Sequence, residues 1–392
     1  MRTHVCRWGP GTFGYSRTRL ELLKATQVPL LNLSKISYDT DNHGTPGGDN
    51  YGEGTLDVDM ISSFGLNVRT IVSNTNTSAS TEEGEGFGQA LLDFLTSLAA
   101  RNESMPHVLS MSLGSLSAAS CDLLCERAAA EKNVDVEKCR SFLQTQRQVC
   151  MFLSPAQASR IDDALRILGL RGVTILGSSG DGGSHFSFGP YSGDGDVADA
   201  LNAVACEYQF PVFPTASPYV LSVGGEMWQN GDSSKPITWT GFGGGSGGGF
   251  SWQFPMPEHQ RDVVTSYLDA ERSAKRLPSA KSFNASGRAY PDIATIGTDG
   301  TSQSCPIAAG MFSLVVDARL RAGLGPLGFP GPRIWNVATA HPGEAFENIP
   351  SGDSGLSCGN GFKSSSESWD PNTGWGRPIW DGWMKYLATD TY

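Results

Sequence analysis

The sequence predicts an α/β fold in which a mostly parallel sheet is covered by helices on both faces. Short apolar segments that read as strands alternate with longer amphipathic segments that read as helices. Helices of this length between strands are typical of right-handed crossovers, which join parallel strands. The 392 residues contain no repeat and no change of composition that would mark a domain boundary. We therefore expect one main layered unit.

The elements follow in this order along the chain. Residues 1–50 are hard to interpret, with a short helix expected near 20–25 and then a polar, glycine-rich loop. We therefore set them apart as a poorly defined N-terminal segment, which is followed by a domain at 51–392. The first clear helix is 50–64, because Leu56, Met60 and Phe64 recur every four residues and Gly65 can end it. The later helices, each with one apolar face, are expected at 88–100, at 155–170 and after Pro306. The strands between them are expected at 68–72, 107–112, 173–176 and 219–223.

Four of the eight cysteines lie close together on two helix-like segments. The Cys-x2-Cys pairs that are typical of zinc sites are absent from this region. We therefore predict two disulfides, Cys121–Cys150 and Cys125–Cys139, that pin a helical hairpin inserted at about 117–153. Disulfides indicate an oxidising compartment.

Composition excludes several classes of partner. The net charge is −11 with no basic cluster, which argues against nucleic acids and anionic membranes. No apolar run reaches the roughly 18 residues of a membrane span. The first residues lack the apolar stretch of a signal peptide, which predicts a processed or truncated form, or a chain not secreted by that route. N-glycosylation sequons, which agree with a secretory route, begin at Asn32, Asn76, Asn102 and Asn284.

A candidate nucleophile lies in the stretch from Gly300 to Pro306. Proline suits the first turn of a helix, because its missing N–H would be unpaired there. Ser302 is therefore expected just before a helix N-terminus, where the positive end of the helix dipole favours a nucleophilic hydroxyl. The commoner interpretation of a serine at this place is a simple helix cap.

Candidate acids occur at two further places. Glu53 and Asp57 are four residues apart on one helical face, which is either a solvated acidic face or a proton-sharing pair. Asp181 follows a predicted strand in the loop 177–183, where it is either a turn residue or, if protonated, a donor to a developing oxyanion. The stretch Ser110–Gly114 ends another strand and could pair with an extended peptide.

These residues together resemble a known family. The chain is similar to the sedolisins, serine-carboxyl peptidases with a subtilisin-like fold, from about Gly52 to Pro378. The resemblance implies that Ser302 is the nucleophile, Glu53 its base, Asp57 the support of that base, and Asp181 the oxyanion donor. It also implies action on peptides or unfolded proteins in acid, with release of tripeptides from free N-termini or endopeptidase action. The stretches that carry the resemblance most strongly are 105–108, 213–220, 247–251 and 283–292.

The same resemblance implies a disulfide and a metal. It implies a bridge between Cys206 and Cys358 and a lysosomal, other acidic secretory, or extracellular location. It also implies one Ca²⁺ near the C-terminus, because oxygen ligands suit a hard cation. Asn348 replaces an acid of the family there, which should weaken binding. The implied ligands are Asn348, the carbonyls of Ile349, Ser366 and Ser368, and Asp370.

Two alternatives stay open. The first is a subtilisin-type triad, because His43-Gly44-Thr45 is similar to the histidine motif of that family, although an apolar helix does not follow it. The second is a catalytically inactive secreted binding protein on the same scaffold. It is suggested by the segment Thr295–Thr301, which is shorter than the family's segment before Ser302. A pH profile distinguishes the first alternative from a mechanism with a carboxyl base, since a histidine base loses activity in acid and a carboxyl base keeps it.

Overall fold

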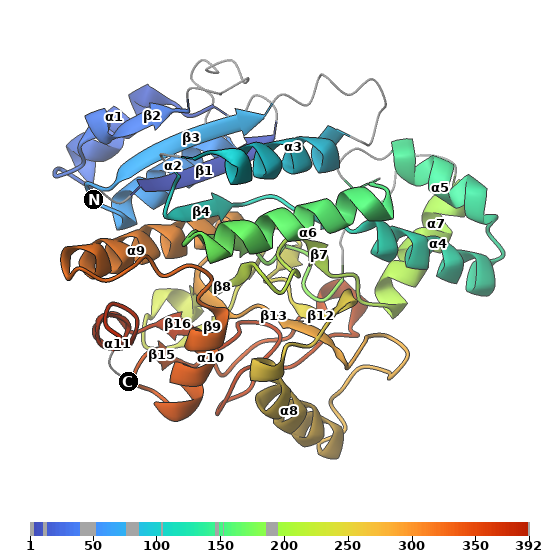
Figure 1. Cartoon of the computed structure of the whole chain (residues 1–392). Coiled ribbons are helices and arrows are strands. Elements are labelled where there is room, and N and C mark those ends of the chain that lie inside the picture. The colour runs from blue at the N-terminus through green and yellow to red at the C-terminus, as the bar shows by residue number, and fades with distance from the viewer. Residues whose placement is uncertain are drawn as a thin grey trace.

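A computed structural model describes residues 4–10, 14–39, 52–75, 86–102, 105–145, 149–151, 153–185 and 195–390. Its centre is an eight-stranded sheet in the order β14-β8-β6-β4-β1-β3-β2 (Figure 1). The eighth strand, β9, pairs with the C-terminal residues of β8. All pairs along this path are parallel, and only β9 is antiparallel. The strands are β1 (His4–Pro10), β2 (Ile36–Tyr38), β3 (Arg69–Thr75), β4 (Val108–Met111), β6 (Thr174–Ser178), β8 (Leu221–Trp228), β9 (Pro236–Thr238) and β14 (Ile293–Ile296).

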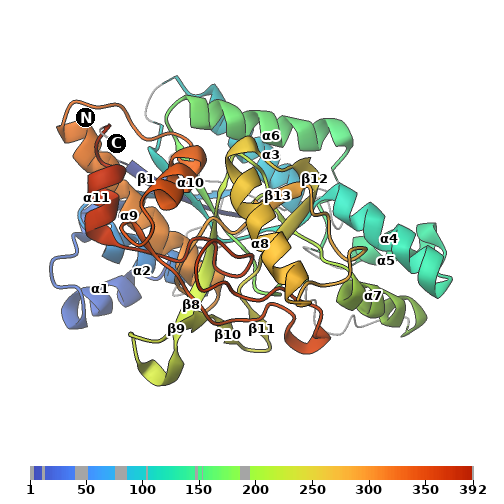
Figure 2. The same cartoon turned by 90° about the horizontal axis from the view of Figure 1, so that it is seen from below.

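Helices cover both faces of this sheet, which confirms the predicted fold class. Helices α3 (Gly86–Ala100) and α6 (Pro155–Leu170) pack on one face, and α2 (Glu53–Phe64) and α9 (Thr301–Arg321) pack on the other (Figures 1 and 2). Successive residues of β4 point to opposite faces. Val108 therefore joins the core beneath α9, whereas Leu109 joins the core beneath α3 and α6.

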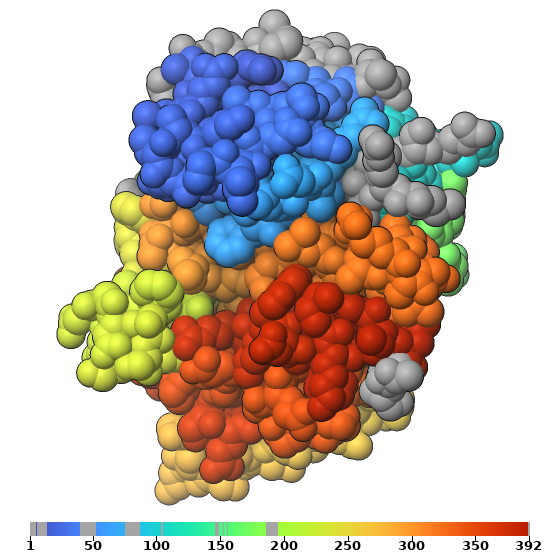
Figure 3. All heavy atoms as spheres, turned by 90° about the vertical axis from the view of Figure 1, so that its left-hand side faces the viewer, coloured from blue at the N-terminus to red at the C-terminus, as the bar shows by residue number. Residues whose placement is uncertain are grey.

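The N-terminal residues contribute a strand that the sequence did not reveal. β1 lies inside the sheet, between β3 and β4. Its sequence, HVCRWGP, interrupts the apolar run with arginine, glycine and proline, so no strand pattern was recognised. The expected short helix is present and longer, as α1 (Arg17–Thr26). On the face shown in Figure 3, these blue N-terminal residues lie above the orange residues of α9 and the red C-terminal residues.

Disulfides hold the peripheral helices. The bridges Cys121–Cys150 and Cys125–Cys139 pin the hairpin of α4 (Ala118–Lys132) and α5 (Val136–Thr145), as predicted. Helix α7 (Gly195–Glu207) packs against this hairpin in a separate apolar core. The bridge Cys206–Cys358 then joins α7 to the C-terminal part of the chain, as the resemblance implied.

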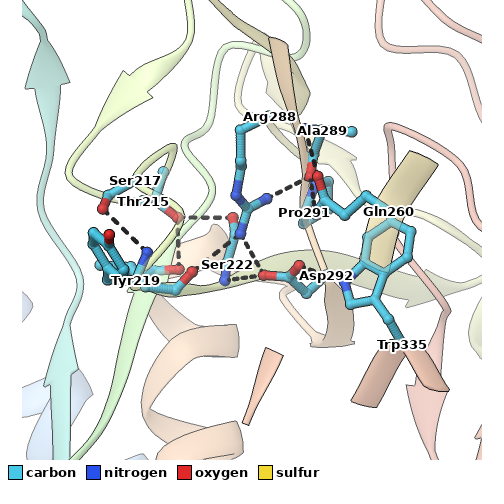
Figure 4. Close-up of polar contacts among 12 residues, drawn as sticks. Thr215, Ser217, Tyr219, Ser222, Gln260, Arg288, Ala289, Pro291, Asp292 and Trp335 are labelled. Atoms are coloured by element: carbon cyan, nitrogen blue, oxygen red, sulfur yellow. Dashed lines mark hydrogen bonds and ion pairs between the residues drawn. The ribbon is translucent and has the colours of Figure 1, made fainter. Parts of the chain in front are cut away.

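A buried ion pair fixes the start of β14. Arg288 and Asp292 are each about 2% exposed, and Nη2 of Arg288 lies 2.6 Å from Oδ2 of Asp292. The same carboxylate accepts the backbone N–H of Ser222 in β8 at 2.7 Å and Nε1–H of Trp335 at 2.9 Å (Figure 4). Asp292 thus ties three elements together at the point where the chain enters β14 and continues to Ser302.

Shorter elements complete the chain. Within the described ranges, no helix has the length and apolar character needed to cross a membrane. The remaining strands are β5 (Ser115–Leu116), β7 (Val212–Phe213), β10 (Thr240–Gly241), β11 (Gly244–Gly245), β12 (Gly249–Pro255), β13 (Gly287–Tyr290), β15 (Phe346–Glu347) and β16 (Arg377–Pro378). The remaining α-helices are α8 (Arg261–Ser273), α10 (Gly331–Ala340) and α11 (Trp380–Tyr386).

Candidate active site

A cavity of about 640 Å³ lies beyond the carboxyl ends of β4 and β6, at the start of α9. Ligand sites in parallel α/β folds are found at this edge of the sheet. One part of its wall is polar and contains Ser112, Asp181 and Ser302. The apolar part of its wall is formed by Leu113, Phe210, Val212, Trp239 and Phe242.

Ser302 lies in the first turn of α9 and not before the helix, because α9 begins at Thr301. The prediction that Pro306 occupies the first turn is therefore wrong, and Pro306 lies inside the helix. Pro306 has no N–H to donate to the carbonyl of Ser302, four residues earlier. The hydroxyl of Ser112 lies 3.3 Å from that carbonyl, although its proton makes a shorter contact with Asp57 at 2.7 Å. Oγ of Ser302 in turn donates to the carbonyl of Ser112 at 3.1 Å. Ser112 thus lies beside the carbonyl that the proline leaves free.

The short segment before Ser302 forms a closed turn. Oε1 of Gln303 accepts hydrogen bonds from Oγ1 of Thr298 and from the backbone N–H of Asp299, each at 3.0 Å. The side chain of Gln303 thereby holds the turn against the first turn of α9. These contacts seat Ser302 at the cavity wall without a longer segment.

Glu53 and Asp57 lie on α2, which packs closely against α9. A Cβ on Gly310 would lie 2.7 Å from the backbone nitrogen of Gly65, so small residues permit this approach. Asp57 is fully buried, and its Oδ1 accepts the hydroxyl of Ser112 at 2.7 Å. Glu53 is the first residue of α2. The commoner interpretation, a solvated acidic face, does not describe Asp57.

Asp57 and Glu53 also act electrostatically on the buried thiol of Cys305. Burial raises the pKa of Cys305 to about 12, and the nearby charges of Asp57 and Glu53 contribute to the same rise. Both carboxyl groups are therefore within electrostatic reach of a residue that lies three positions after Ser302. The specific role of Glu53 as the base for Ser302 stays a prediction.

Asp181 lies on the loop after β6 and contacts the residue before Ser302. Its Oδ1 accepts the backbone N–H and the hydroxyl of Thr301, each at 2.8 Å. The carboxyl group opens to the cavity, but surrounding protein atoms still displace much of its water. This burial raises the pKa of Asp181, and the Thr301 hydrogen bonds oppose the rise only in part. No lysine or arginine of the described chain forms an ion pair with it.

Gly300 is needed for the contact between Asp181 and α9. Its φ is +91°, and a Cβ there would lie 2.7 Å from Oδ2 of Asp181. Any larger residue would meet both a strained backbone and the carboxyl group. The glycine thus allows Asp181 to approach the backbone N–H of Thr301.

Ser112 is the residue that the sequence reasoning missed. It connects Asp57 to both the hydroxyl and the carbonyl of Ser302. The available signal was its place at the carboxyl end of β4, in a stretch that we singled out only for peptide binding. The structure therefore brings Asp57, Asp181 and Ser302 to one region, whereas His43 lies outside the described residues.

The implied calcium ligands lie on the chain segment that connects β15 to β16. Asp370 is fully buried and accepts backbone N–H groups of Ser365, Asn372 and Thr373 at 2.8–3.0 Å. Burial raises the pKa of Asp370 to about 7. Nδ2 of Asn348 donates to the carbonyl of Ser368 at 2.6 Å.

One observation tests whether these residues suit a cation. Oδ1 of Asn348 is buried and has no hydrogen-bond partner among the described residues. A buried amide oxygen without a partner is compatible with a ligand of a hard cation. Asp370 is the sole carboxylate of the implied set, so the fit is that of a weak site.

Comparison with known proteins gives a consistent result. No protein-family model matches the chain. The chain is 33% identical to tripeptidyl-peptidase 1 of Homo sapiens and 32% identical to that of Canis lupus familiaris, in each case over 358 residues, 86% of this chain and 51% of the relative. It is 35% identical to tripeptidyl-peptidase 1 of Bos taurus over 258 residues, 60% of this chain and 41% of that protein. The chain thus spans about half the length of these relatives.

Comparison of folds points to the same group. The structure of Pseudomonas sedolisin, a serine-carboxyl proteinase complexed with two molecules of pseudo-iodotyrostatin, matches with a TM-score of 0.64 at 20% identity. The match covers 100% of this chain and 93% of that structure. At this identity the match demonstrates a shared fold.

Proposed function

The chain belongs to the sedolisin family of serine-carboxyl peptidases, and from this premise we propose that it is a serine-type peptidase that acts in acid. The observation that carries the proposal is that Ser302 lies close to two acids of different environment, one of which shares its cavity. Asp57 is fully buried and linked to Ser302 through Ser112, whereas Asp181 opens to the cavity.

The proposed reaction begins with the hydroxyl of Ser302. Its oxygen attacks the carbonyl carbon of the scissile peptide bond, and Glu53 accepts its proton. Asp57 supports Glu53 electrostatically, in the way that the third member of a Ser-His-Asp triad supports its base. The proton held by Glu53 then passes to the leaving amine, and water completes hydrolysis of the acyl-enzyme through the same groups.

Asp181 is proposed to stabilise the tetrahedral intermediate. A charged carboxylate would repel the oxyanion, so only the protonated acid can donate a hydrogen bond to it. Burial raises the pKa of Asp181, which extends the pH range over which it keeps its proton. Activity should therefore be present in acid and fall as the pH rises through the pKa of Asp181.

The apolar wall of the cavity suggests the kind of substrate. Phe242 is 89% exposed in the turn between β10 and β11, and it lines the cavity together with Trp239. An exposed aromatic ring beside a nucleophile is suited to contact an apolar side chain of a bound peptide. We expect the preferred peptides to carry such a side chain near the scissile bond.

Hydrolysis of a fluorogenic tripeptide amide at about pH 4 tests the proposal. Ser302→Ala should lower kcat by at least about 10³-fold, because it removes the hydroxyl that forms the acyl intermediate in the proposed reaction. Equal rates for the native and variant chains would instead support a binding protein on the same scaffold. A rate that peaks near neutral pH would favour a histidine base.

The finer activity is release of tripeptides from free N-termini, with endopeptidase action as the alternative. The name of the relatives supports the first. N-terminal acetylation of a longer peptide separates them: acetylation blocks an enzyme that needs the free amine and leaves an endopeptidase unaffected. We also propose an acidic secretory or extracellular location, which the disulfides favour. Of the sequons, Asn32 and Asn102 are exposed.

We propose that Ca²⁺ binds weakly to the chain segment that connects β15 to β16 and rigidifies this segment. Asn348, Asp370 and the carbonyls of Ile349, Ser366 and Ser368 would hold it. Thermal unfolding in CaCl₂ and in EGTA is the test, with Asn348→Asp as the variant. The added carboxylate should enlarge the difference in Tm between the two conditions. Identical Tm values in both conditions, for both chains, would refute the site.

A further inference from the structure

His185 is a buried histidine that the proposed reaction does not use. It lies four residues after Asp181 on the same loop, is 4% exposed, and borders the cavity. A buried titratable side chain so close to a proposed oxyanion donor is well placed to affect that donor's position.

Both ring nitrogens of His185 contact main-chain carbonyl oxygens. Nδ1 lies 2.9 Å from the oxygen of Ala205 and 3.2 Å from that of Tyr208. Nε2 lies 2.8 Å from the oxygen of Asn360. Carbonyl oxygens can only accept, and a neutral imidazole has only one N–H. A neutral ring would therefore direct one nitrogen lone pair at an oxygen, whereas an imidazolium satisfies both contacts.

The surroundings also favour a positive ring. Ala205 belongs to the last turn of α7, where unpaired carbonyls form the negative end of the helix dipole. The disulfide Cys206–Cys358 joins this end of α7 to the segment that contains Asn360. The three carbonyls that receive His185 thus come from two segments that are covalently linked beside it.

We propose that His185, as an imidazolium, is a positioning residue that holds the Asp181 loop against α7 and the Cys358 segment. The ring anchors the loop at residue 185, and the contact of Asp181 with Thr301 anchors it four residues earlier. The importance of this anchor for catalysis rests on the proposed function, but the charged state of the ring does not. The anchor is complete only while both ring nitrogens carry a proton, because each of them faces a carbonyl oxygen.

Other charges near His185 are already paired. At the end of α7, the carboxylate of Glu207 lies 3.4 Å from both Lys132 and Lys281. Tyr208 donates its hydroxyl to Glu131. On the C-terminal segment, Asp353 pairs with Lys363, and Asn360 is neutral. On the part of this loop that the structure describes, up to residue 185, Asp181 is the other titratable group. The carbonyl oxygens are thus the direct polar partners of the ring.

Nuclear magnetic resonance of the intact chain labelled with ¹⁵N-histidine tests the charged state directly. At pH 5 the His185 ring should give two slowly exchanging N–H signals, because both protons are buried in hydrogen bonds. The signals are assigned by their loss in His185→Gln or, should that variant not fold, by elimination with Gln variants of the other histidines. A single ring N–H for His185 at pH 5 would overturn the inference.

Kinetics tests the positioning role, with Ser184→Ala as the matched control. Oγ of Ser184 anchors the same loop to the carbonyl of Ser354 at 3.1 Å, but it does not titrate. His185→Gln should lower kcat about tenfold at pH 4–5 with little change in KM, since misplaced groups slow the chemical step. This deficit should shrink as the pH rises, whereas any deficit of Ser184→Ala should stay constant. A constant deficit for His185→Gln would refute the positioning role. A native chain that hydrolyses no peptide would refute the proposed function, and the magnetic resonance result would still decide the charge.

Discussion

Two aspartates of the chain, Asp292 and Asp181, differ in how the fold treats their carboxyl groups. Asp292 is sealed in the protein, with the guanidinium of Arg288 at 2.6 Å and two N–H donors from other elements (Figure 4). Asp181 opens to the cavity, and within the described residues its carboxyl group receives the neutral donors of Thr301 and no cation. The first carboxylate is used to join elements, and the second is left accessible to a ligand.

The difference shows how a protein separates structural acids from reactive ones. In a buried ion pair such as that of Asp292 and Arg288, removal of one partner leaves an uncompensated buried charge, so the pair is fixed in the structure. A crowded carboxyl group without a cation holds its proton to higher pH. Burial accordingly raises the pKa of Asp181. The predictions below test this contrast.

The largest effect is expected from removal of the cation beside Asp292. Arg288→Met should destabilise the chain by about 3–5 kcal/mol, because it leaves a buried charge unpaired. Arg140→Met, which removes an exposed ion pair with Asp122, is the control and should change stability little. Chemical denaturation measures both. A loss for Arg288→Met no larger than that of the control would remove the contrast between the two aspartates.

The next effect concerns Asp181 itself. Asp181→Ala should lower kcat about 10²–10³-fold without comparable loss of stability, since it removes an oxyanion donor. Asp181→Asn keeps a donor that does not titrate. In the proposed mechanism, native activity falls with increasing pH when Asp181, whose pKa is raised by burial, loses its proton. The Asn variant has no such proton to lose, so its rate should fall less toward pH 7. Parallel pH profiles of native and Asn chains would contradict the proposed role.

A smaller effect is expected from the glycine that admits Asp181. Gly300→Ala should cost about 1–3 kcal/mol for its strained backbone and should also reduce activity, because its Cβ meets Asp181. Gly323→Ala is the matched control: φ there is +78°, but a Cβ would have no neighbour within 4 Å. The control should lose stability and keep activity. Equal activity in both variants would show that the Asp181 contact is not needed.

The smallest effect is expected at the apolar wall. Phe242→Ala should raise KM about tenfold for peptides with an apolar side chain near the scissile bond, and less for their alanine counterparts. Leu170→Ala, at an 82% exposed site that does not line the cavity, is the control. Stability should be unchanged in both. A uniform change across all peptides would argue against side-chain recognition by Phe242.

Local patterns predicted much of the fold. The alternation of apolar segments gave the parallel sheet and its helices, and cysteine spacing gave the hairpin bridges. The missed elements have local causes. Strand β1 is interrupted by polar and turn residues. The start of α9 was placed too late, because proline usually occupies the first turn of a helix, whereas Pro306 lies inside α9. Ser112, which links Asp57 to Ser302, could be identified only from contacts between distant segments.

The sequence by itself determined which residues are chemically able to act: one serine after a glycine, two acids four residues apart, and a third acid in a loop. Only the tertiary structure decided which of these acids is sealed, which opens to a cavity, and which has a cation beside it. The reason is physical. Protonation depends on the dielectric and on charges within a few ångströms, and residues 57, 112, 181 and 302 become neighbours only when the sheet is complete.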